Sequence, residues 1–315
     1  MNFVVPSSAY VYTSPHICNL THQLIEVLIP LTVSDILGSM IRILTWNVNS
    51  IRKRVAHLCS VLTEHRVDIA LLQETKCTDD QFPLAELEDL GYRCYIHGQK
   101  SRNGVAILSK YPVVGKVCDT IFDAEEGIGA VQDTGSYSMA EARYLECLVD
   151  CQDVKVRVAS VYVPNGQEVD TETFAYKLNF LQCLKAKMLK LLAREDWLVI
   201  GGDYNVAPDD IDVYDAQALD GKLCFHPKER AGLREMLHLG FTDAFRVLHE
   251  GKQEFSWWNY REGAWQRNRG MRIDHLLLSP HAVDKLVECS ILSSVRGLES
   301  PSDHAPVMCV LRKLV

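Results

Sequence analysis

The chain of 315 residues is 47% hydrophobic and 23% charged, which is enough apolar material for one large domain with a substantial core. No stretch is long and apolar enough to predict a membrane span, and a net charge of -8 lacks the basic excess typical of DNA-binding chains. The eleven cysteines include no CxxC pair, so we interpret them as reduced core residues of a cytoplasmic protein that does not attach to membranes.

Residues 1–39 contain no Lys or Arg, so they predict neither a secretory signal peptide nor an Arg-rich transit peptide. We expect an N-terminal extension that is poorly ordered and not needed for the chemistry. Two alternatives stay open, namely an upstream translation start and a short amphipathic segment at 24–37 that docks on the domain. The folded domain is expected to span residues 40–315.

The first two predicted strands end in polar side chains. The apolar run 41–49 ends with Asn47 and Asn49, and the run 69–76 ends with Glu74. Further along the chain, spacing and composition predict helices at 55–65 and 171–192, strands at 143–149, 154–163 and 197–200, and long surface loops at 119–141 and 205–227.

The run 198–205 is the most informative stretch. Its apolar strand is expected to stop at Gly201 and Gly202 and to present Asp203 and Asn205 at its end. Side chains two residues apart in an extended chain share one face. The Asp could therefore accept a proton while the Asn orients the reacting group.

Polar residues also flank the last strands. Asp274 opens the apolar run 276–278, and Asp303 and His304 precede a strand at 307–311. A sheet whose strand ends meet at one rim would gather all these polar side chains in a single cleft.

Several acids with Asn and His, and no Cys cluster, favour Mg2+ or Mn2+ over Zn2+ as the bound ion. Phosphate-ester cleavage needs a polarised phosphoryl oxygen, an activated water and a stabilised leaving oxygen. A metal, an Asp and a His could supply these three functions.

The chain resembles the exonuclease III family of apurinic/apyrimidinic endonucleases, within the endonuclease/exonuclease/phosphatase superfamily. The matching motifs occur in the family's order, and they are Trp46–Arg52, Leu72–Lys76, Asn103–Ser109, Val161–Gly166, Gly202–Pro208, Phe255–Trp258, Arg269–Asp274 and Ser302–Pro306. The resemblance implies an α/β fold, a four-layer α/β-sandwich of two packed mixed or antiparallel sheets flanked by helices. It also implies that residues 40–315 form the catalytic domain.

The resemblance implies a Mg2+-dependent DNA repair nuclease, with Mn2+ as a possible substitute, that hydrolyses the phosphodiester 5′ to abasic sites. It leaves a 3′ hydroxyl and a 5′ deoxyribose phosphate. The expected substrate is double-stranded DNA with abasic sites or blocked 3′ ends, and 3′ to 5′ exonuclease and 3′-end-cleaning activities are expected as well. We expect the protein to act as a monomer.

The resemblance also implies a role for each matching residue. Glu74 would bind the metal with Asn47 and Asp303 nearby, Asp203 would activate the water, and Asp274 would orient His304 toward the phosphoryl oxygen. The residues expected to contact the phosphate, the leaving group or the DNA are Tyr162, Asn205, Asn165, Asn49 and Arg269. Trp257, Met271 and Ile273 would form the apolar pocket for the flipped-out deoxyribose. Bulkier or branched apolar side chains would also suit the pocket position that Met271 occupies.

Basic residues near these motifs are expected to face phosphates, and they are Arg52, Lys53, Arg54, Arg261, Arg267, Arg269 and Arg272. Each residue also has a plain structural interpretation. Asp303 could cap a turn, Asp274 could be a buried acid paired with Arg272, and Trp257 could be ordinary packing.

Two other functions stay open. The first is a superfamily phosphodiesterase or phosphatase acting on a lipid or small-molecule phosphate. The second is a catalytically inactive nucleic-acid-binding regulator, which should have lost acids or His304, whereas this chain retains them.

Overall fold

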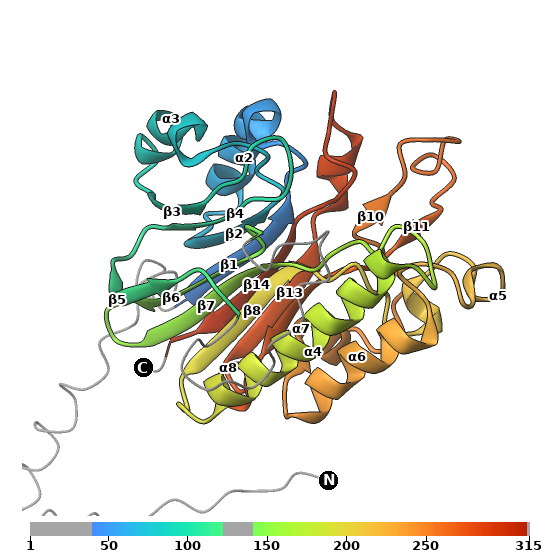
Figure 1. Ribbon diagram of the computed structural model, residues 1–315. Coiled ribbons are helices and arrows are strands. Elements are labelled where there is room, and N and C mark those ends of the chain that lie inside the picture. Colours follow the sequence, from blue (N-terminus) through green and yellow to red (C-terminus); the bar gives the residue numbers. More distant parts are fainter. Residues whose placement is uncertain (1–39, 122–140, 314–315) are drawn as a thin grey trace, which may run out of the picture. The chain divides into compact units, whose positions relative to one another are not determined.

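The computed structural model describes residues 40–121 and 141–313 (Figure 1). The expected N-terminal extension 1–39, including its segment 24–37, and most of the loop predicted at 119–141 lie outside the described residues.

Two six-stranded sheets form the centre of the fold. The first has the order β13-β14-β1-β2-β4-β3, with bounds Leu286–Ile291, Val307–Arg312, Met40–Asn47, Ile69–Gln73, Val105–Ser109 and Arg93–His97. The second has the order β5-β6-β7-β8-β12-β9, with bounds Val113–Cys118, Tyr144–Asp150, Lys155–Tyr162, Trp197–Asp203, Asp274–Leu278 and Thr242–Asp243. Each sheet is mixed, because β1 pairs in parallel with β2 and β7 pairs in parallel with β8 while the other pairs are antiparallel.

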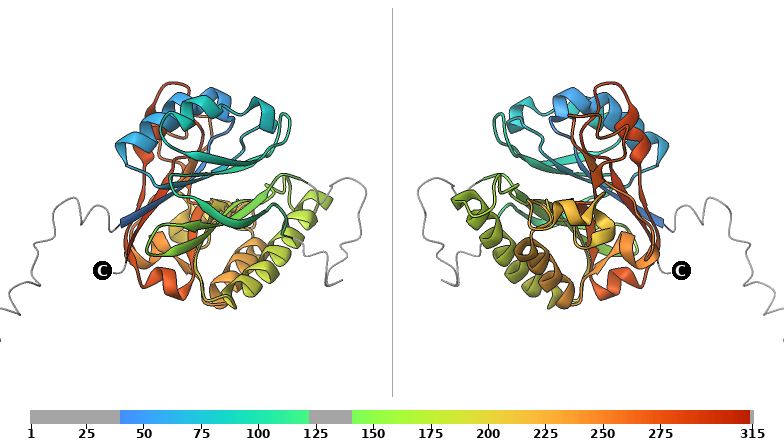
Figure 2. Two further views of the ribbon diagram at one scale, coloured as in Figure 1. Left: turned by 90° about the vertical axis from the view of Figure 1, so that its left-hand side faces the viewer. Right: turned by 90° about the vertical axis from the view of Figure 1, so that its right-hand side faces the viewer.

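Helices lie on the outer sides of the two sheets, as Figure 2 shows. The α-helices are α2 (Ile51–Glu64), α3 (Leu84–Glu88), α4 (Glu172–Leu192), α5 (Ala216–Leu219), α6 (Pro227–His238), α7 (Ala244–Leu248) and α8 (Pro280–Val283). Three 3-10 turns, at Asp79–Gln81, Asp210–Asp212 and Ser293–Gly297, and a short hairpin of β10 (Trp257–Trp258) and β11 (Gly270–Met271) complete the described elements.

Alternation along the strands produces three apolar layers. Ile43 and Leu71 face the space between the sheets, whereas Trp46 packs outward beneath α2. The outer face of the second sheet packs in the same way against α4 and α6, which contribute Leu184 and Met236. Helix, sheet, sheet and helix therefore follow one another, and the predicted four-layer sandwich is confirmed.

The two glycines of the 198–205 run lie inside strand β8, so the prediction that the strand stops at them is wrong. An added Cβ on Gly201 would lie 2.7 Å from side-chain atoms of Leu71 in the opposite sheet and of Leu276 on the neighbouring strand β12. An added Cβ on Gly202 would lie 2.0 Å from the Val161 carbonyl oxygen. These glycines allow close packing between and along the sheets, and the strand reaches Asp203.

The sequence predicts a long surface loop at 205–227, and this prediction is wrong. The segment contains a 3-10 turn and α5, and it buries apolar side chains such as Val213 and Phe225. Helix α2 begins at Ile51, four residues before its predicted start at residue 55, because the Ile51 N–H donates to the carbonyl of Thr75 at 3.1 Å.

Within 40–121 and 141–313, no helix combines the length and apolar character needed to cross a membrane.

Candidate active site

The polar side chains predicted to converge lie at one end of both sheets. Asn47 and Asp203 end strands β1 and β8, and Asp274 opens β12. Because side chains alternate along a strand, these three continue the rows of residues that face the space between the sheets. All three are buried, so the cleft places charged and amide groups at the end of the central core.

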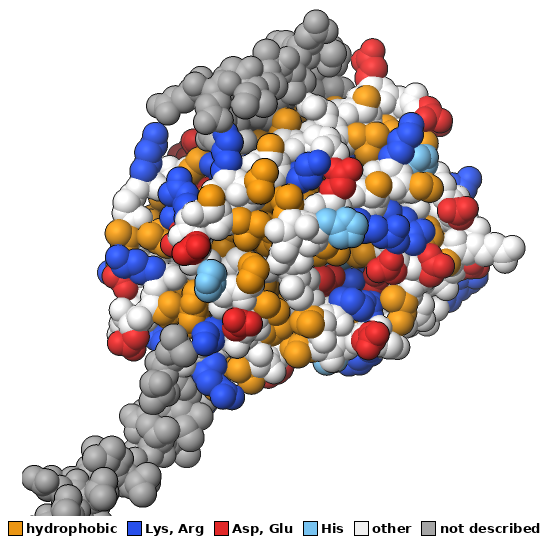
Figure 3. Space-filling model, turned by 90° about the horizontal axis from the view of Figure 1, so that it is seen from below, with side chains coloured by type: hydrophobic (Ala, Val, Ile, Leu, Met, Phe, Trp, Pro, Cys, Tyr) orange, Lys and Arg blue, Asp and Glu red, His pale blue; other side chains and the backbone are white. Residues whose placement is uncertain are grey.

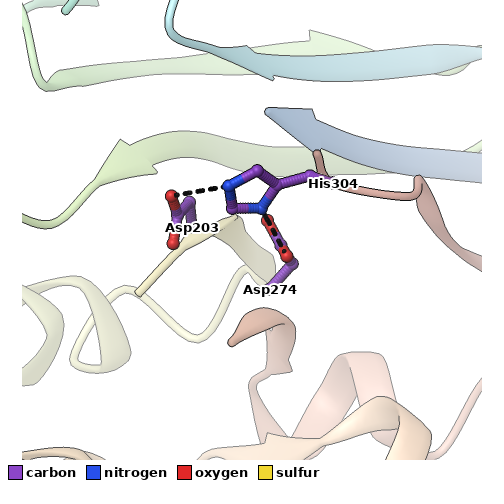
Figure 4. Close-up of side chains that lie close together, drawn as sticks. All are labelled: Asp203, Asp274 and His304. Atoms are coloured by element: carbon purple, nitrogen blue, oxygen red, sulfur yellow. Dashed lines mark hydrogen bonds and ion pairs between the residues drawn. The ribbon is translucent and has the colours of Figure 1, made fainter. Parts of the chain in front are cut away.

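His304 lies between two carboxylates, as Figure 4 shows. Its Nδ1 is 2.9 Å from Asp274 Oδ2, and its Nε2 is 3.7 Å from Asp203 Oδ2. Asp274 does not pair with Arg272, so that structural alternative is wrong. The imidazole is instead held by Asp274 on one side and directed toward Asp203 on the other.

A serine that the sequence analysis did not single out fixes Asp274. Ser256 Oγ donates to Asp274 Oδ2 at 2.6 Å and accepts from the backbone N–H groups of Ile273 and Asp274 at 3.1 and 3.0 Å. The residue lies in the quoted motif Phe255–Trp258, but nothing in the sequence connects it to an aspartate 18 residues away.

Charges in this group shift one another's pKa. Burial raises the pKa of Asp203 to about 7, with the nearby Asp274 carboxylate adding to the rise and the His304 imidazolium opposing it. Burial alone would lower the pKa of His304, but the carboxylates of Asp274 and Asp203 raise it to about 10. Near neutral pH the cleft therefore holds a charged imidazole next to a carboxylate that can gain or lose a proton.

Asn47 joins this group to a second cluster of oxygens. Its Nδ2 donates to Asp203 Oδ2 at 2.9 Å and to Glu74 Oε1 at 3.0 Å. Lys76 Nζ lies 2.5 Å from Glu74 Oε2 and donates to Asn49 Oδ1 at 2.6 Å. Burial opposes ionisation of Glu74, but Lys76 and Asn47 together lower the pKa of that carboxyl.

Asp303 closes the cluster. Asn49 Nδ2 donates to Asp303 Oδ1 at 2.8 Å, and Trp257 Nε1 donates to Asp303 Oδ2 at 3.1 Å. These bonds and His304 lower the pKa of Asp303 in spite of its burial. The alternative that Trp257 is ordinary packing is incomplete, because its indole N–H contacts a cleft carboxylate.

The backbone at the strand ends adopts the left-handed conformation at several residues other than glycine. The φ angles are 44° at Asn49, 52° at Glu74, 53° at Lys76 and 51° at Asn205. This conformation is uncommon outside glycine and concentrates at functional sites. The prediction that Asn205 lies in an extended chain is therefore wrong. In the left-handed conformation its N–H donates to Asp203 Oδ1 at 2.9 Å.

The predicted residue Asn165 contacts Asn205. Asn165 Nδ2 donates to Asn205 Oδ1 at 3.0 Å, while Asn205 Nδ2 donates to the Val163 carbonyl at 3.0 Å.

Tyr162 ends β7, and burial together with Glu74 and Asp203 raises the pKa of its hydroxyl well above the usual value. The Arg143 guanidinium lies 4.7 Å from the centre of the Tyr162 ring.

A small apolar cluster contains the three residues that the resemblance selects for the sugar pocket. Met271 and Ile273 belong to a small buried cluster with Val213 and Phe225, and Trp257 packs against it. A backbone bridge joins Trp257 to His304, so the cluster adjoins the carboxylate cleft.

The basic residues separate into two groups. Five are exposed, namely Arg52, Lys53, Arg261, Arg267 and Arg269, and Arg269 lies over the ring of Tyr214 at 6.0 Å. The prediction that Arg54 and Arg272 face phosphates is wrong. Arg272 is buried between Asp212 and Asp243, at 2.7 and 2.6 Å, and Arg54 donates to the backbone carbonyl of Asn49 at 2.7 Å.

The donors present fit a hard divalent cation. Asp203, Asp274 and His304 offer ligand atoms within 4.8 Å of one another, but the His304 ring nitrogens already face carboxylates. Glu74, Asn47 and Asp303 offer oxygens alone, the ligand type that Mg2+ prefers. Both sets of side chains therefore offer donor types that a hard divalent cation accepts.

The fold and the cleft define a four-layer α/β sandwich protein with an acidic, histidine-containing site at one end of its paired sheets. A family model described as the Endonuclease/Exonuclease/phosphatase family matches residues 44–304. The chain belongs to this family.

Relatives of known function cover nearly the whole described chain. Exodeoxyribonuclease III of Haemophilus influenzae is 31% identical, over 84% of this chain and 98% of the relative. The structure of an AP endonuclease from Archaeoglobus fulgidus has a TM-score of 0.76 and 32% identity, covering 86% of this chain and 99% of that one. A 3′ phosphatase from Neisseria, bound to a product DNA hairpin, has a TM-score of 0.76 and 34% identity, covering 85% and 98%. The predicted resemblance to the exonuclease III family is confirmed.

Proposed function

We propose that this protein is a Mg2+-dependent DNA repair nuclease that hydrolyses the phosphodiester 5′ to abasic sites in duplex DNA, with 3′ to 5′ exonuclease and 3′-end-cleaning activity. One observation carries the proposal. The Asn47 amide donates hydrogen bonds to both the Asp203 and the Glu74 carboxylates. Asp203, which could activate water, and Glu74, which could hold a cation, are therefore linked by a single side chain. The names of the relatives, an exodeoxyribonuclease and an AP endonuclease, support the substrate class.

The side chains of the chain divide the chemistry among them. Asp203 accepts a proton from the attacking water, whose oxygen forms the new bond to phosphorus as the bond to the 3′ oxygen breaks. His304 stays protonated because its pKa is raised to about 10, so its Nε2 can stabilise charge on a phosphoryl oxygen. Asn205 and Asn165 hold the phosphate, and Tyr162 keeps its hydroxyl proton near neutral pH and can donate it in a hydrogen bond.

Glu74, Asn47 and Asp303 would hold the cation. When it is bound, Mg2+ supplies Lewis-acid polarisation of the phosphoryl oxygen and stabilises the leaving oxygen. Asn49 and Lys76 keep the oxygens of this set in place through the bonds described above.

The DNA is proposed to lie across the cleft, with its backbone against the exposed arginines and Lys53. The baseless deoxyribose would enter the pocket of Trp257, Met271 and Ile273, whose apolar side chains suit a sugar that lacks a base. Figure 3 shows one face of the molecule, on which Lys and Arg side chains are mixed with Asp and Glu side chains. Because the net charge of the chain is -8, DNA binding would depend on the local charge of the exposed basic residues.

We also propose that the enzyme acts as a monomer in the cytoplasm and that residues 40–315 carry its activity. The cysteines of the described chain are all free thiols, which fits a reducing compartment.

The test is to map the products of a labelled duplex that carries one abasic analogue, with Mg2+ and with EDTA. The proposal predicts a single metal-dependent cut 5′ to the lesion that leaves a 3′ hydroxyl. Hydrolysis of a phospholipid or inositol phosphate without DNA cleavage would overturn it in favour of the phosphatase alternative. Tight DNA binding without cleavage would overturn it in favour of an inactive regulator.

A further inference from the structure

A lysine outside the cleft is completely enclosed behind it. Lys177 lies on α4, and its side chain forms an ion pair with Glu229 of α6, with 0% of either side chain exposed. The two helices lie side by side on the outer face of the second sheet (Figure 1). A buried ion pair of this kind gives little net stability compared with apolar residues of the same size, so another consequence is worth seeking.

The ammonium group of Lys177 has three hydrogens and three acceptors. Besides Glu229 Oε1, its Nζ donates to the backbone carbonyls of Asn205 at 2.7 Å and Asn165 at 3.1 Å. Glu229 is fixed in turn, because its Oε2 accepts from the backbone N–H of His226 at 3.0 Å. One cation thus ties together the chain segments that follow strands β7 and β8.

Those two segments carry the asparagines proposed to hold the phosphate. Asn205 adopts the left-handed φ of 51°, and its N–H donates to Asp203 Oδ1, so its backbone also orients the proposed base. The packing around Lys177 is close, because a Cβ added to Gly166 would lie 3.0 Å from Lys177 Cδ. A loss of the Lys177 donors would leave two buried or partly buried carbonyls without this partner and release both loops.

We infer that Lys177 is a positioning residue, neutralised by Glu229, that holds Asn165 and Asn205 in the geometry needed for phosphodiester hydrolysis. The inference rests on the proposed function, since it assigns Lys177 a part in that reaction. Lys177 does not face the cleft, so its effect passes through the asparagines and should appear in turnover rather than in DNA binding.

The test uses the full chain and the pair variant Lys177→Met/Glu229→Gln, which leaves no buried charge unpaired. A matched control is Lys185→Met/Glu235→Gln, because Lys185 and Glu235 form an ion pair of 2.7 Å between the same two helices but are partly exposed and contact neither loop. Thermal unfolding and circular dichroism establish that each variant is folded, and Lys177→Gln/Glu229→Gln, which keeps one donor, replaces the pair variant if that one unfolds.

Each variant is measured for kcat and KM on the abasic duplex, alone and combined with Asn205→Ala. We expect the pair variant to lower kcat by about tenfold or more with KM nearly unchanged, because small displacements of positioning groups are costly. In the Asn205→Ala background the same change should lower kcat clearly less than it does in the wild type, because the part of its effect that passes through Asn205 is already lost. The control Lys185→Met/Glu235→Gln should stay near the wild type.

Equal losses of kcat in both backgrounds would show a merely structural role and overturn the inference, as would an unchanged kcat in the pair variant. Hydrogen exchange at the Asn205 amide provides a readout that needs no activity. Protection should fall in the pair variant and persist in the control, and unchanged protection would also overturn the inference. A wild-type protein that does not cut the abasic duplex would instead refute the proposed function, while the exchange measurement would still decide the role of Lys177.

Discussion

At the scale of single residues, the cleft depends on side chains that each satisfy two neighbours. Asn47 contacts two carboxylates, and His304 lies between two others. Such buried polar groups are costly when a partner is lost, so each one constrains the position of the next. The proposed division between a cation set and a water-activating set follows from these contacts.

Replacing Glu74 tests the cation set. Glu74→Gln removes a charge that Mg2+ would otherwise contact, so the Mg2+ concentration for half-maximal incision should rise by about tenfold or more. Titration of the incision rate with Mg2+ measures this shift, and the exposed Glu64→Gln is the control. An unchanged Mg2+ dependence in Glu74→Gln would remove Glu74 from the cation set.

The pKa shifts predict the pH dependence of turnover. Asp203 must be deprotonated to accept a proton, and its pKa is raised to about 7, so kcat should rise with pH until about pH 7. His304 must stay protonated, and its pKa is raised to about 10, so kcat should fall again near pH 10. A profile of kcat at saturating Mg2+ checks both limbs, and a rate that is flat between pH 5 and pH 8 would contradict the role of Asp203.

At the scale of elements, strand β8 determines how closely the two sheets meet at the cleft. Gly201 faces Leu71 and Leu276 with no room for a methyl group. The strand therefore carries Asp203 to the opposite sheet, where Asn47 contacts it. The sequence signal of paired glycines resembles a turn, and only the arrangement of both sheets shows the packing reason.

Gly201→Ala tests this packing. The added methyl group should force the sheets apart and lower the free energy of unfolding by about 1–3 kcal/mol, as overpacking does in other cores. Gly251→Ala is the control, because nothing lies within 4 Å of its added Cβ, and a change within about 0.5 kcal/mol is expected there. Denaturant unfolding of both variants gives the values, and equal stabilities would contradict the account.

Much of the fold followed from local patterns. Regular apolar spacing predicts a helix at 171–192, and helix α4 begins within one residue of that range. In the structure Thr171 caps its start by accepting a hydrogen bond from the Phe174 N–H.

The burial of Arg272 could not be predicted, because it depends on Asp212 and Asp243, which reach Arg272 from distant parts of the chain. The apolar core of 205–227 could not be predicted either, because Val213 and Phe225 pack against Met271 and Ile273 further along the chain. Local sequence contains no signal for such pairings.

The site shows the same division. The motifs contained the residues that meet in the cleft, and their order along the chain carried the family resemblance. Ser256 and Lys177 act through contacts with Asp274, Asn165 and Asn205 that only the folded chain reveals. The sequence contains many serines and lysines, and nothing about Ser256 or Lys177 in the sequence distinguishes them from the others.

At the scale of the whole molecule, an acidic chain carries exposed basic residues in two segments close to the site motifs, among others: Arg52 with Lys53 at the start of α2, and three arginines in 261–269. These segments flank residues of the cleft, since α2 follows Asn49 and 261–269 lies between Trp257 and Met271. The central claim is that these surfaces bring one phosphodiester of an abasic duplex to Asp203.

The most direct measurement is single-turnover incision of an abasic duplex in Mg2+ by the wild type and by Asp203→Asn. The account predicts rapid cutting by the wild type and a loss of about 100-fold or more in Asp203→Asn, with DNA affinity retained, because the substitution removes the base and little else. Incision by Asp203→Asn at the wild-type rate would contradict it.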